Sequence, residues 1–128
     1  MKMADIDYDT NTQYDVIVIG GGAAGLVSSS FLAALDLEVA LVSDGHPGGE
    51  CLWTGCVPSK ALIHAASLAK RGVSGDDSFY EVMNFMKKAR ETIAHHDSVE
   101  TIEQRNGVKV ITGKARFIDK NTIKINEN

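Results

Sequence analysis

The stretch YDVIVIGGGAAG, residues 14–25, decides the fold of this 128-residue chain. Its first part, residues 14–19, is a short run rich in β-branched side chains, which is typical of a strand buried on both faces of a parallel sheet. The glycines lead into residues 23–35, which predict a helix without charged side chains that packs on a sheet. A second apolar run at residues 38–42 predicts a second strand. Together these segments indicate a βαβ unit and an α/β fold.

The glycines of this stretch fit the pattern G-x-G-x-x-G, with Gly20, Gly22 and Gly25 at the glycine positions. One glycine allows a tight turn, the second lets a pyrophosphate approach the backbone, and the third lets helix and strand pack closely. The pyrophosphate then lies at the helix N-terminus, where backbone N–H groups favour an anion. A glycine-rich turn without a ligand is the alternative. The residues predicted to contact the cofactor here are Gly20, Gly22, Ala23, Ala24 and Gly25.

A dinucleotide-binding unit also needs an acidic residue at the end of its second strand, about 20 residues further on, to bind the ribose hydroxyls. The sequence has Ser43 at this position and Asp44 directly after it. Asp44 can take the acidic role after a shift of one residue. We therefore predict that Ser43 and Asp44 lie beside the ribose, with a departure from the usual pattern at Ser43.

Both cysteines of the chain lie in the stretch GGECLWTGCVPSK, residues 48–60. Residues five positions apart on a regular helix point in different directions, so a bond between Cys51 and Cys56 needs an irregular turn. Gly55 supplies the backbone freedom for such a turn. Pro58 fits the start of a helix, which places Cys56 at a helix N-terminus, where the dipole favours the thiolate.

The spacing of the cysteines leaves three interpretations. Redox chemistry is favoured, because a disulfide closing so short a loop would contribute only about 2 kcal/mol and cytosolic disulfides are usually catalytic. Lys60 lies on the same helical face as Cys56 and adds positive charge. A structural disulfide or a pair of buried thiols is the second interpretation. A zinc site is the third, but it needs two more ligands, and His95 and His96 are adjacent rather than spaced as ligands.

Composition limits the class of protein. The hydrophobic fraction of 44% is enough to build the core of one domain. The formal net charge is −4 with both signs interspersed, so neither nucleic acid nor an anionic membrane is expected as a partner. No apolar run reaches membrane-spanning length, and residues 1–13 predict a flexible polar arm rather than a signal peptide. These features predict a cytoplasmic protein.

A pair of helices is expected after the cysteines. Residues 59–70 are rich in alanine and leucine and predict a helix, whereas residues 71–77 predict a loop. Ser78 and Glu81 have the spacing of a capping box at the start of a second helix. That helix carries an apolar stripe, which we expect to pack on the sheet. The members of the stripe are Phe79, Val82, Met86, Ala89 and Ile93.

The remaining residues predict one short helix and several strands. The helix starts at Asp97 to Glu100 and ends near Asn106 and Gly107, a good C-terminal capping pair. Residues 108–112 predict a strand. A hairpin is expected from strands at residues 115–118 and 122–125, joined by a polar turn.

These features together resemble the flavin-dependent pyridine nucleotide–disulfide oxidoreductases. The resemblance rests on the βαβ unit with its glycine pattern and on Gly-Gly-x-Cys-x4-Cys-x-Pro-Ser-Lys. The sequence of residues 51–62 is similar to that of the mercuric-reductase-like and dihydrolipoyl-dehydrogenase-like branches. The sequence HDSVE at residues 96–100 also resembles the mercuric-reductase-like branch. The resemblance implies a three-layer Rossmann-type FAD-binding domain with the start of a β-meander. It is expected to be incomplete, with residues 14–128 as its N-terminal part and the nicotinamide and dimerisation domains absent.

The resemblance also implies roles for individual residues. The cofactor would be FAD. Cys56 would lie against the flavin in a thiolate–flavin charge-transfer contact, and Cys51 would be the interchange thiol that faces the substrate. Lys60 would lie beside the flavin N5 edge, and the backbone of Ala115 would meet the adenine. Glu50 stands where relatives often have a hydroxyl residue, so only its backbone N–H is expected near the phosphates. The further cofactor contacts implied in this segment are Gly49 and Glu50.

The implied reaction carries electrons from NAD(P)H through FAD to a Cys51–Cys56 disulfide and on to a small-molecule substrate. Mercuric ion and a dihydrolipoamide-like disulfide are the expected substrates, and the complete enzyme would be a homodimer. This chain alone is expected to lack nicotinamide-dependent turnover. Two alternatives remain, namely a non-catalytic FAD-binding remnant and a flavin-free thiol-redox or interaction domain.

Overall fold

The computed structural model describes residues 12–70 and 79–126. The loop expected at residues 71–77, Ser78 of the capping box and most of the N-terminal arm lie outside the described residues. The elements are β1 (Val16–Ile19), α1 (Ala23–Ala33), β2 (Val39–Ser43), α2 (Gly49–Trp53), α3 (Cys56–Lys70), α4 (Phe79–His96), α5 (Val99–Asn106), β3 (Lys109–Thr112), β4 (Lys114–Phe117) and β5 (Ile123–Asn126).

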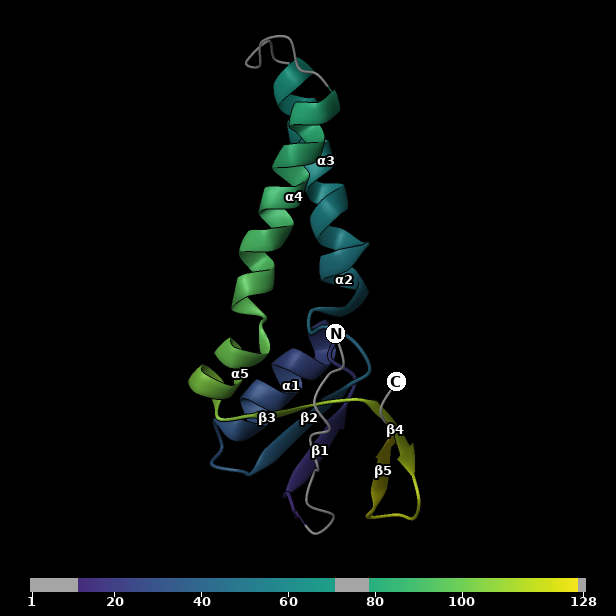
Figure 1. Ribbon diagram of the computed structural model, residues 1–128. Helices are drawn as coiled ribbons and strands as arrows, with labels where there is room; N and C mark the ends of the chain where they lie inside the picture. The colour runs from purple at the N-terminus through teal and green to yellow at the C-terminus, as the bar shows by residue number, and fades with distance from the viewer. Residues whose placement is uncertain (1–11, 71–78, 127–128) are drawn as a thin grey trace.

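The centre of the fold is a parallel sheet with the order β1-β2-β3. Leu41 of β2 lies opposite Val18 of β1 on one side and opposite Val110 of β3 on the other. Helices α1 and α5 lie against one face of this sheet (Figure 1), and the antiparallel hairpin β4–β5 packs on the other. The expected α/β architecture with a parallel sheet and helices is confirmed, and the layers are helices, sheet and hairpin.

Strand β2 carries the core because it is covered on both faces and paired on both edges. Its residues are all buried. Val39 and Leu41 point toward α1 and α5, where they join a cluster with Ile102, Val108 and Val110. Ala40 and Val42 point the other way and join Ile111 and apolar side chains of the hairpin. The alternation follows from the two-residue period of a strand.

Strand β1 differs from its prediction. The apolar run at residues 14–19 predicted burial on both faces, but only Val18 packs into the cluster beneath α1. Ile17 and Ile19 remain 36% and 47% exposed. The physical reason is that β1 lies at the edge of the described sheet, and the face that carries Ile17 opens into a cavity instead of a packed layer.

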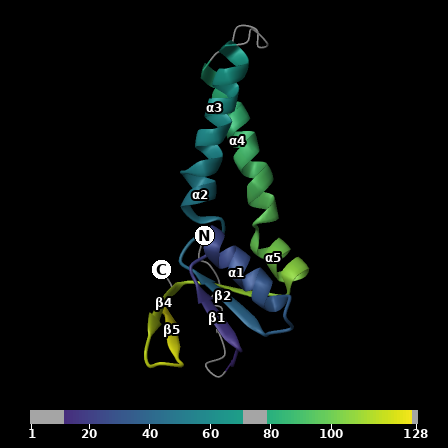
Figure 2. The ribbon, with the colours of Figure 1, turned by 180° about the vertical axis from the view of Figure 1, so that it is seen from behind.

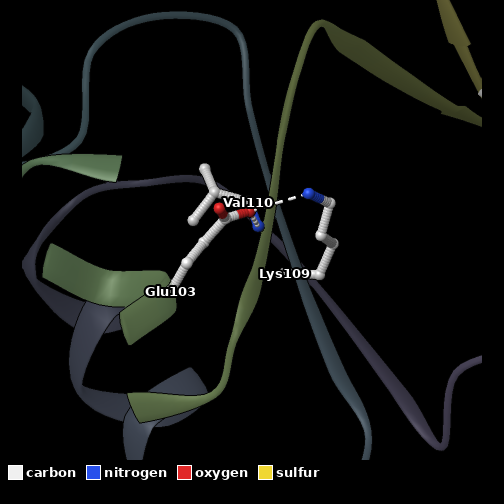
Figure 3. Close-up of polar contacts among 3 residues, drawn as sticks. All are labelled: Glu103, Lys109 and Val110. Atoms are coloured by element: carbon white, nitrogen blue, oxygen red, sulfur yellow. Dashed lines mark hydrogen bonds and ion pairs between the residues drawn. The ribbon is translucent and has the colours of Figure 1, made fainter. Parts of the chain in front are cut away.

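Helix α5 ends where the sequence predicts, but its N-cap is Ser98, one residue after the predicted Asp97. The Ser98 hydroxyl accepts a hydrogen bond from the Thr101 N–H, and Gly107 ends the helix with a positive φ of 67°. Glu103 then joins α5 to β3 (Figure 3): its Oε1 accepts from Lys109 Nζ at 2.9 Å and from the Val110 N–H at 3.2 Å. The second contact gives the Val110 N–H an acceptor at the edge of the sheet, where no strand pairs with β3 in the described part of the chain.

Helices α3 and α4 form a long antiparallel pair that projects away from the sheet (Figures 1 and 2). The expectation that the apolar stripe of α4 packs on the sheet is wrong, because α4 packs along α3 and touches α2 and α5. Met86 is buried, whereas Phe79 at the far end is 78% exposed. The middle of the stripe, around Met86, is covered, whereas Phe79 and Ile93 near the two ends are exposed, because a periodic pattern does not say which element covers a face or how far.

Candidate active site

The turn between β1 and α1 has the geometry of an anion-binding glycine turn. Gly20 has a positive φ of 110°, and its N–H donates to the Val42 carbonyl at 2.8 Å. A side chain at Gly25 would collide with the Gly20 carbonyl oxygen, so only glycine lets α1 start this close to the strand. At Gly22, by contrast, a Cβ would meet no atom within 4 Å. The backbone at Gly22 is therefore open to a ligand.

The first turn of α1 carries no acidic side chain of its own. Gly22 is the N-cap residue, no side chain caps the helix, and the first turn contains no acidic residue. The four leading N–H groups of a helix have no partner within the helix, and the helix dipole adds about half a positive charge there. An anion such as a pyrophosphate fits this position.

A second glycine pair lies directly against the first turn. The Gly48 N–H donates to the Gly21 carbonyl at 2.8 Å, and Gly48 forms an isolated parallel bridge with Gly22. A Cβ built on Gly49 would lie 2.9 Å from the Gly22 Cα, so the two backbones touch. The glycine turn and the cysteine stretch, which are separate motifs in the sequence, are thereby one structural unit.

The residues at the end of β2 lie under this unit. Ser43 is buried, and its hydroxyl donates to the Gly45 carbonyl at 2.9 Å. A Cβ on Gly21 would come within 2.5 Å of the Ser43 Oγ, so Ser43 packs beneath the glycine turn. Asp44, the next residue, is exposed at the end of the strand. Of the two residues predicted near the ribose, Asp44 is the one with an accessible side chain.

The two cysteines lie on either side of a break between two helices. Helix α2 ends at Trp53 and α3 begins at Cys56. The Gly55 N–H donates to the Glu50 carbonyl at 2.6 Å, and a Cβ on Gly55 would be only 2.9 Å from that oxygen. The sharp turn at Gly55 brings the side chain of Cys51 within hydrogen-bonding reach of Cys56. Both are free thiols, with Cys51 half-buried and Cys56 exposed.

The proximity of the thiols makes them chemically unequal. The hydrogen bond to Cys56, desolvation and the negative charge of Cys56 together raise the pKa of Cys51, and the charge of Lys60 acts in the opposite direction. Two thiols this close ionise in sequence, because the first thiolate opposes the second. A close pair in which one thiol ionises first is the arrangement that thiol–disulfide exchange requires.

The other predicted contacts are distributed around this centre. Glu50 is exposed in the first turn of α2, and Lys60 is exposed on α3, one turn after Cys56. Ala115 lies apart from the cysteines, half-buried in β4 among the residues that pack on Ala40 and Val42. Its strand is nevertheless connected to the end of β2, because the Gly113 N–H donates to the Ser43 carbonyl at 2.8 Å.

The sequence did not indicate a role for Trp53 or Arg90. In the structure, Arg90 of α4 lies beside Trp53, which is part of the cysteine stretch. The guanidinium carbon of Arg90, on α4, lies 5.6 Å from the centre of the Trp53 ring. The Trp53 indole N–H donates to the Pro47 carbonyl at 3.1 Å. The only signal in the sequence was the position of Trp53 between the two cysteines, and nothing in the periodicity of α4 distinguished Arg90.

A cavity of about 510 Å³ lies elsewhere, between the sheet and the hairpin. It is lined mainly by apolar side chains such as Ile17, Val42 and Ile123, and it includes neither the glycine turn nor a cysteine. Within residues 12–70 and 79–126, no three His, Cys, Asp or Glu side chains gather as a metal site would require. None of the described helices has the length and apolar character needed to cross a membrane.

The sequence model of the family described as "Pyridine nucleotide-disulphide oxidoreductase" matches residues 14–128. The chain belongs to this family. It is 35% identical over 122 residues to a dihydrolipoyl dehydrogenase of Mycobacterium leprae, covering 89% of this chain and 26% of that protein. It is 31% identical over 127 residues to a mercuric reductase of Bacillus cereus, covering 92% of this chain and 20% of that protein. The chain thus spans about a quarter or less of the length of these relatives.

Solved structures agree on the fold. One of them is the Cu(II) complex of a cysteine-to-serine mutant of RclA, an HOCl-induced flavoprotein disulfide reductase from Escherichia coli. It superposes on this chain with a TM-score of 0.75 at 24% sequence identity. The superposition covers 91% of this chain and 25% of the reductase chain. The Rossmann-like arrangement of sheet and helices is therefore that of the corresponding region of a disulfide reductase.

Proposed function

We propose that this chain is the FAD-binding, dithiol-bearing part of a flavoprotein that passes electrons from NAD(P)H through FAD to a Cys51–Cys56 disulfide. The observation that carries the proposal is the contact between the two glycine motifs. The Gly48 N–H bonds to the Gly21 carbonyl, so the helix that bears Cys51 starts where the open end of α1 lies. A cofactor whose phosphates rest on α1 would have the dithiol as its neighbour.

The residues present fit an anionic dinucleotide. The backbone at Gly22 is open, the first turn of α1 has no acidic side chain, and Asp44 is exposed at the end of β2. In this proposal the turn formed by Gly20, Gly22 and Gly25 binds the pyrophosphate, assisted by the backbone of Gly49 and Glu50. Asp44 binds the ribose. When bound, the flavin supplies a carrier of two electrons between the nicotinamide and the disulfide.

The dithiol provides the second half of the chemistry. In this proposal, reduction of the disulfide adds two electrons and one proton, which gives a thiol at Cys51 and a thiolate at Cys56. The raised pKa of Cys51 supports this division, because its causes include the hydrogen bond and the charge of Cys56. Lys60 offsets part of the negative charge. Oxidation of the pair would deliver the two electrons to the substrate.

The substrate follows from what a close dithiol reacts with. A disulfide of the dihydrolipoamide type accepts the electrons by exchange, and Hg(II) is a soft cation that binds thiolates. Both substrates remain in the proposal, since the curated relatives include a dihydrolipoyl dehydrogenase and a mercuric reductase. We further propose that the complete enzyme is a cytoplasmic homodimer.

Titration of the purified chain with FAD tests the proposal. We expect saturable binding, measured by the absorbance of FAD. Binding should be lost in Gly22→Val, because a branched side chain would fill the opening above the turn. Ala34→Val is the matched control, since Ala34 is exposed beyond the far end of α1. A folded chain that ignores FAD would contradict the proposal and favour a flavin-free thiol domain.

A second measurement separates an active dithiol from a FAD-binding remnant. Reduction of the FAD-loaded chain should produce a long-wavelength absorbance band from a Cys56 thiolate beside the flavin. Cys56→Ser should abolish the band and leave FAD bound, whereas Thr54→Ser, in the same turn, should keep both. Bound FAD without any such band in the unmodified chain would support the remnant.

A further inference from the structure

Trp53 is the single tryptophan of the chain, and it lies in α2, two residues after Cys51. Its side chain makes three contacts, two with the preceding loop and one with α4. The indole N–H donates to the Pro47 carbonyl at 3.1 Å, and the His46 ring lies 5.6 Å away at an angle of 47°. The third contact comes from α4, where the Arg90 guanidinium lies over the ring at 5.6 Å. Trp53 thus joins α2 to its preceding loop and to α4.

Arg90 has an unusual environment for a guanidinium. Its Nε is buried and has no hydrogen-bond partner. A buried donor without an acceptor is unfavourable, so a solvated arginine conformation would compete unless another contact compensates. The face of the Trp53 ring is the contact observed at this position, and an indole is the strongest aromatic partner for a cation. The contact therefore links α2 to α4.

From Trp53 the contacts continue to the glycine turn. Pro47, which accepts the indole hydrogen bond, precedes Gly48, and Gly48 bonds to the Gly21 carbonyl at 2.8 Å. The loop that Trp53 closes is thus the loop that touches the first glycine motif. The charged groups that shift the pKa of Cys51 are Cys56 and Lys60, so an influence of Arg90 on the dithiol acts through position.

We propose that Arg90 is a positioning residue for the dithiol: through the Trp53 ring it holds α2 so that Cys51 stays within bonding reach of Cys56. A thiol that is held in place attacks the mixed disulfide between its partner and glutathione at a high effective concentration and releases reduced glutathione, so the internal disulfide is favoured. This inference rests on the proposed function, because positioning of Cys51 matters only if the two cysteines cycle between dithiol and disulfide.

The equilibrium of the full chain with glutathione tests the proposal. In this reaction Cys51 and Cys56 give two electrons and two protons to oxidised glutathione, which becomes two molecules of reduced glutathione. Acid quenching, alkylation and mass spectrometry give the disulfide fraction. We expect Arg90→Met to lower the equilibrium constant for disulfide formation by about threefold or more, and Arg90→Lys to restore most of it, because lysine keeps the cation over the ring.

Controls separate positioning from simple stabilisation. Arg105→Met makes the same replacement at an exposed position on α5 and should leave the constant unchanged. Urea unfolding is measured for each variant, because a merely structural contact lowers the unfolding midpoint and leaves the redox constant of the folded protein alone. Emission of Trp53 should change in Arg90→Met and stay unchanged in Arg105→Met.

Each outcome bears on one of the two proposals. A folded Arg90→Met variant with the unmodified constant would overturn the positioning role and leave the proposed function intact. Absence of any Cys51–Cys56 disulfide in the unmodified chain would overturn both. Where Arg90→Met does not fold, Trp53→Leu decides, because it removes the ring that the Arg90 guanidinium contacts and keeps an apolar side chain. An unchanged constant in that variant would contradict the proposal.

Discussion

At the residue scale, the clearest division of roles is among glycines that look alike in the sequence. Gly25 lacks a side chain because α1 packs against the Gly20 carbonyl, whereas the open surface at Gly22 faces no protein atom within 4 Å. The first is a packing requirement and the second is available for a ligand. The sequence pattern predicts a separate role for each glycine of the motif, and the neighbours of Gly25 agree with the packing role predicted for it.

Glu103 gives a prediction about pH. Its hydrogen bond with Lys109 and then that with the Val110 N–H hold the pKa of this carboxyl below its usual range. A lowered folded-state pKa means that the stabilisation is present above the unfolded pKa and disappears as the pH falls through the folded value. Glu103→Gln should therefore lower the free energy of unfolding at pH 7 by less than about 1 kcal/mol, since the pair is partly exposed.

The measurement is urea unfolding of both proteins between pH 7 and pH 2. The difference between them should shrink as the pH falls below about 4, where the carboxylate of the unfolded chain takes up a proton before that of the folded chain does. Glutamine keeps an oxygen that can accept from the Val110 N–H, so the variant isolates the effect of charge. A difference that stays constant across this range would contradict the assignment of the ion pair.

At the element scale, α5 shows how local signals and tertiary contacts combine. Ser98 caps the helix, Ile102 enters the core, and Glu103 reaches β3. Ser98→Ala should lower the free energy of unfolding by about 1 kcal/mol, because the Thr101 N–H loses its acceptor. Ser28→Ala, at an exposed site on α1, is the matched control and should not destabilise the protein. Equal urea midpoints for all three proteins would contradict the capping role.

The pair α3 and α4 shows the limit of element-scale reasoning. The apolar stripe of α4 predicted a covered face and a helix; the helix is present, but within the stripe only Met86 is buried. The covering element is α3 rather than the sheet, and His64 of α3 stacks on Phe85 of α4 at 5.8 Å. A helical period states that a face is buried, but the choice of partner depends on where the chain enters and leaves the helix.

At the scale of the whole molecule, stability depends on β2, the strand shared by both core clusters. Leu41 is fully buried, whereas Val27 on α1 is 70% exposed. Leu41→Ala should cost about 2–5 kcal/mol, which is a large part of the stability of a domain of this size. Val27→Ala should cost far less, because its side chain already faces solvent. Chemical denaturation followed by circular dichroism compares the two, and a similar loss in both would contradict the central role of β2.

Much of the local structure could be predicted from the sequence. The β-branched run before Gly20, the glycine spacing, the C-terminal capping residue Gly107 and the hairpin turn each depend on interactions within a few residues. Such interactions are encoded in short segments, so a segment read alone is informative. The burial of β1 was overestimated for the complementary reason: apolar character indicates that a residue can be buried, but not that another element covers it.

By itself, the sequence determined the βαβ unit, the dithiol at the start of a helix, and membership of the oxidoreductase family, because each depends on residue types at fixed short spacings. Only the tertiary structure decided that Gly48 bonds to Gly21, that α4 covers α3, and that Arg90 lies over Trp53. These contacts join residues far apart in the chain. They form only when the packing of the whole domain repays the entropy of ordering the segments between them.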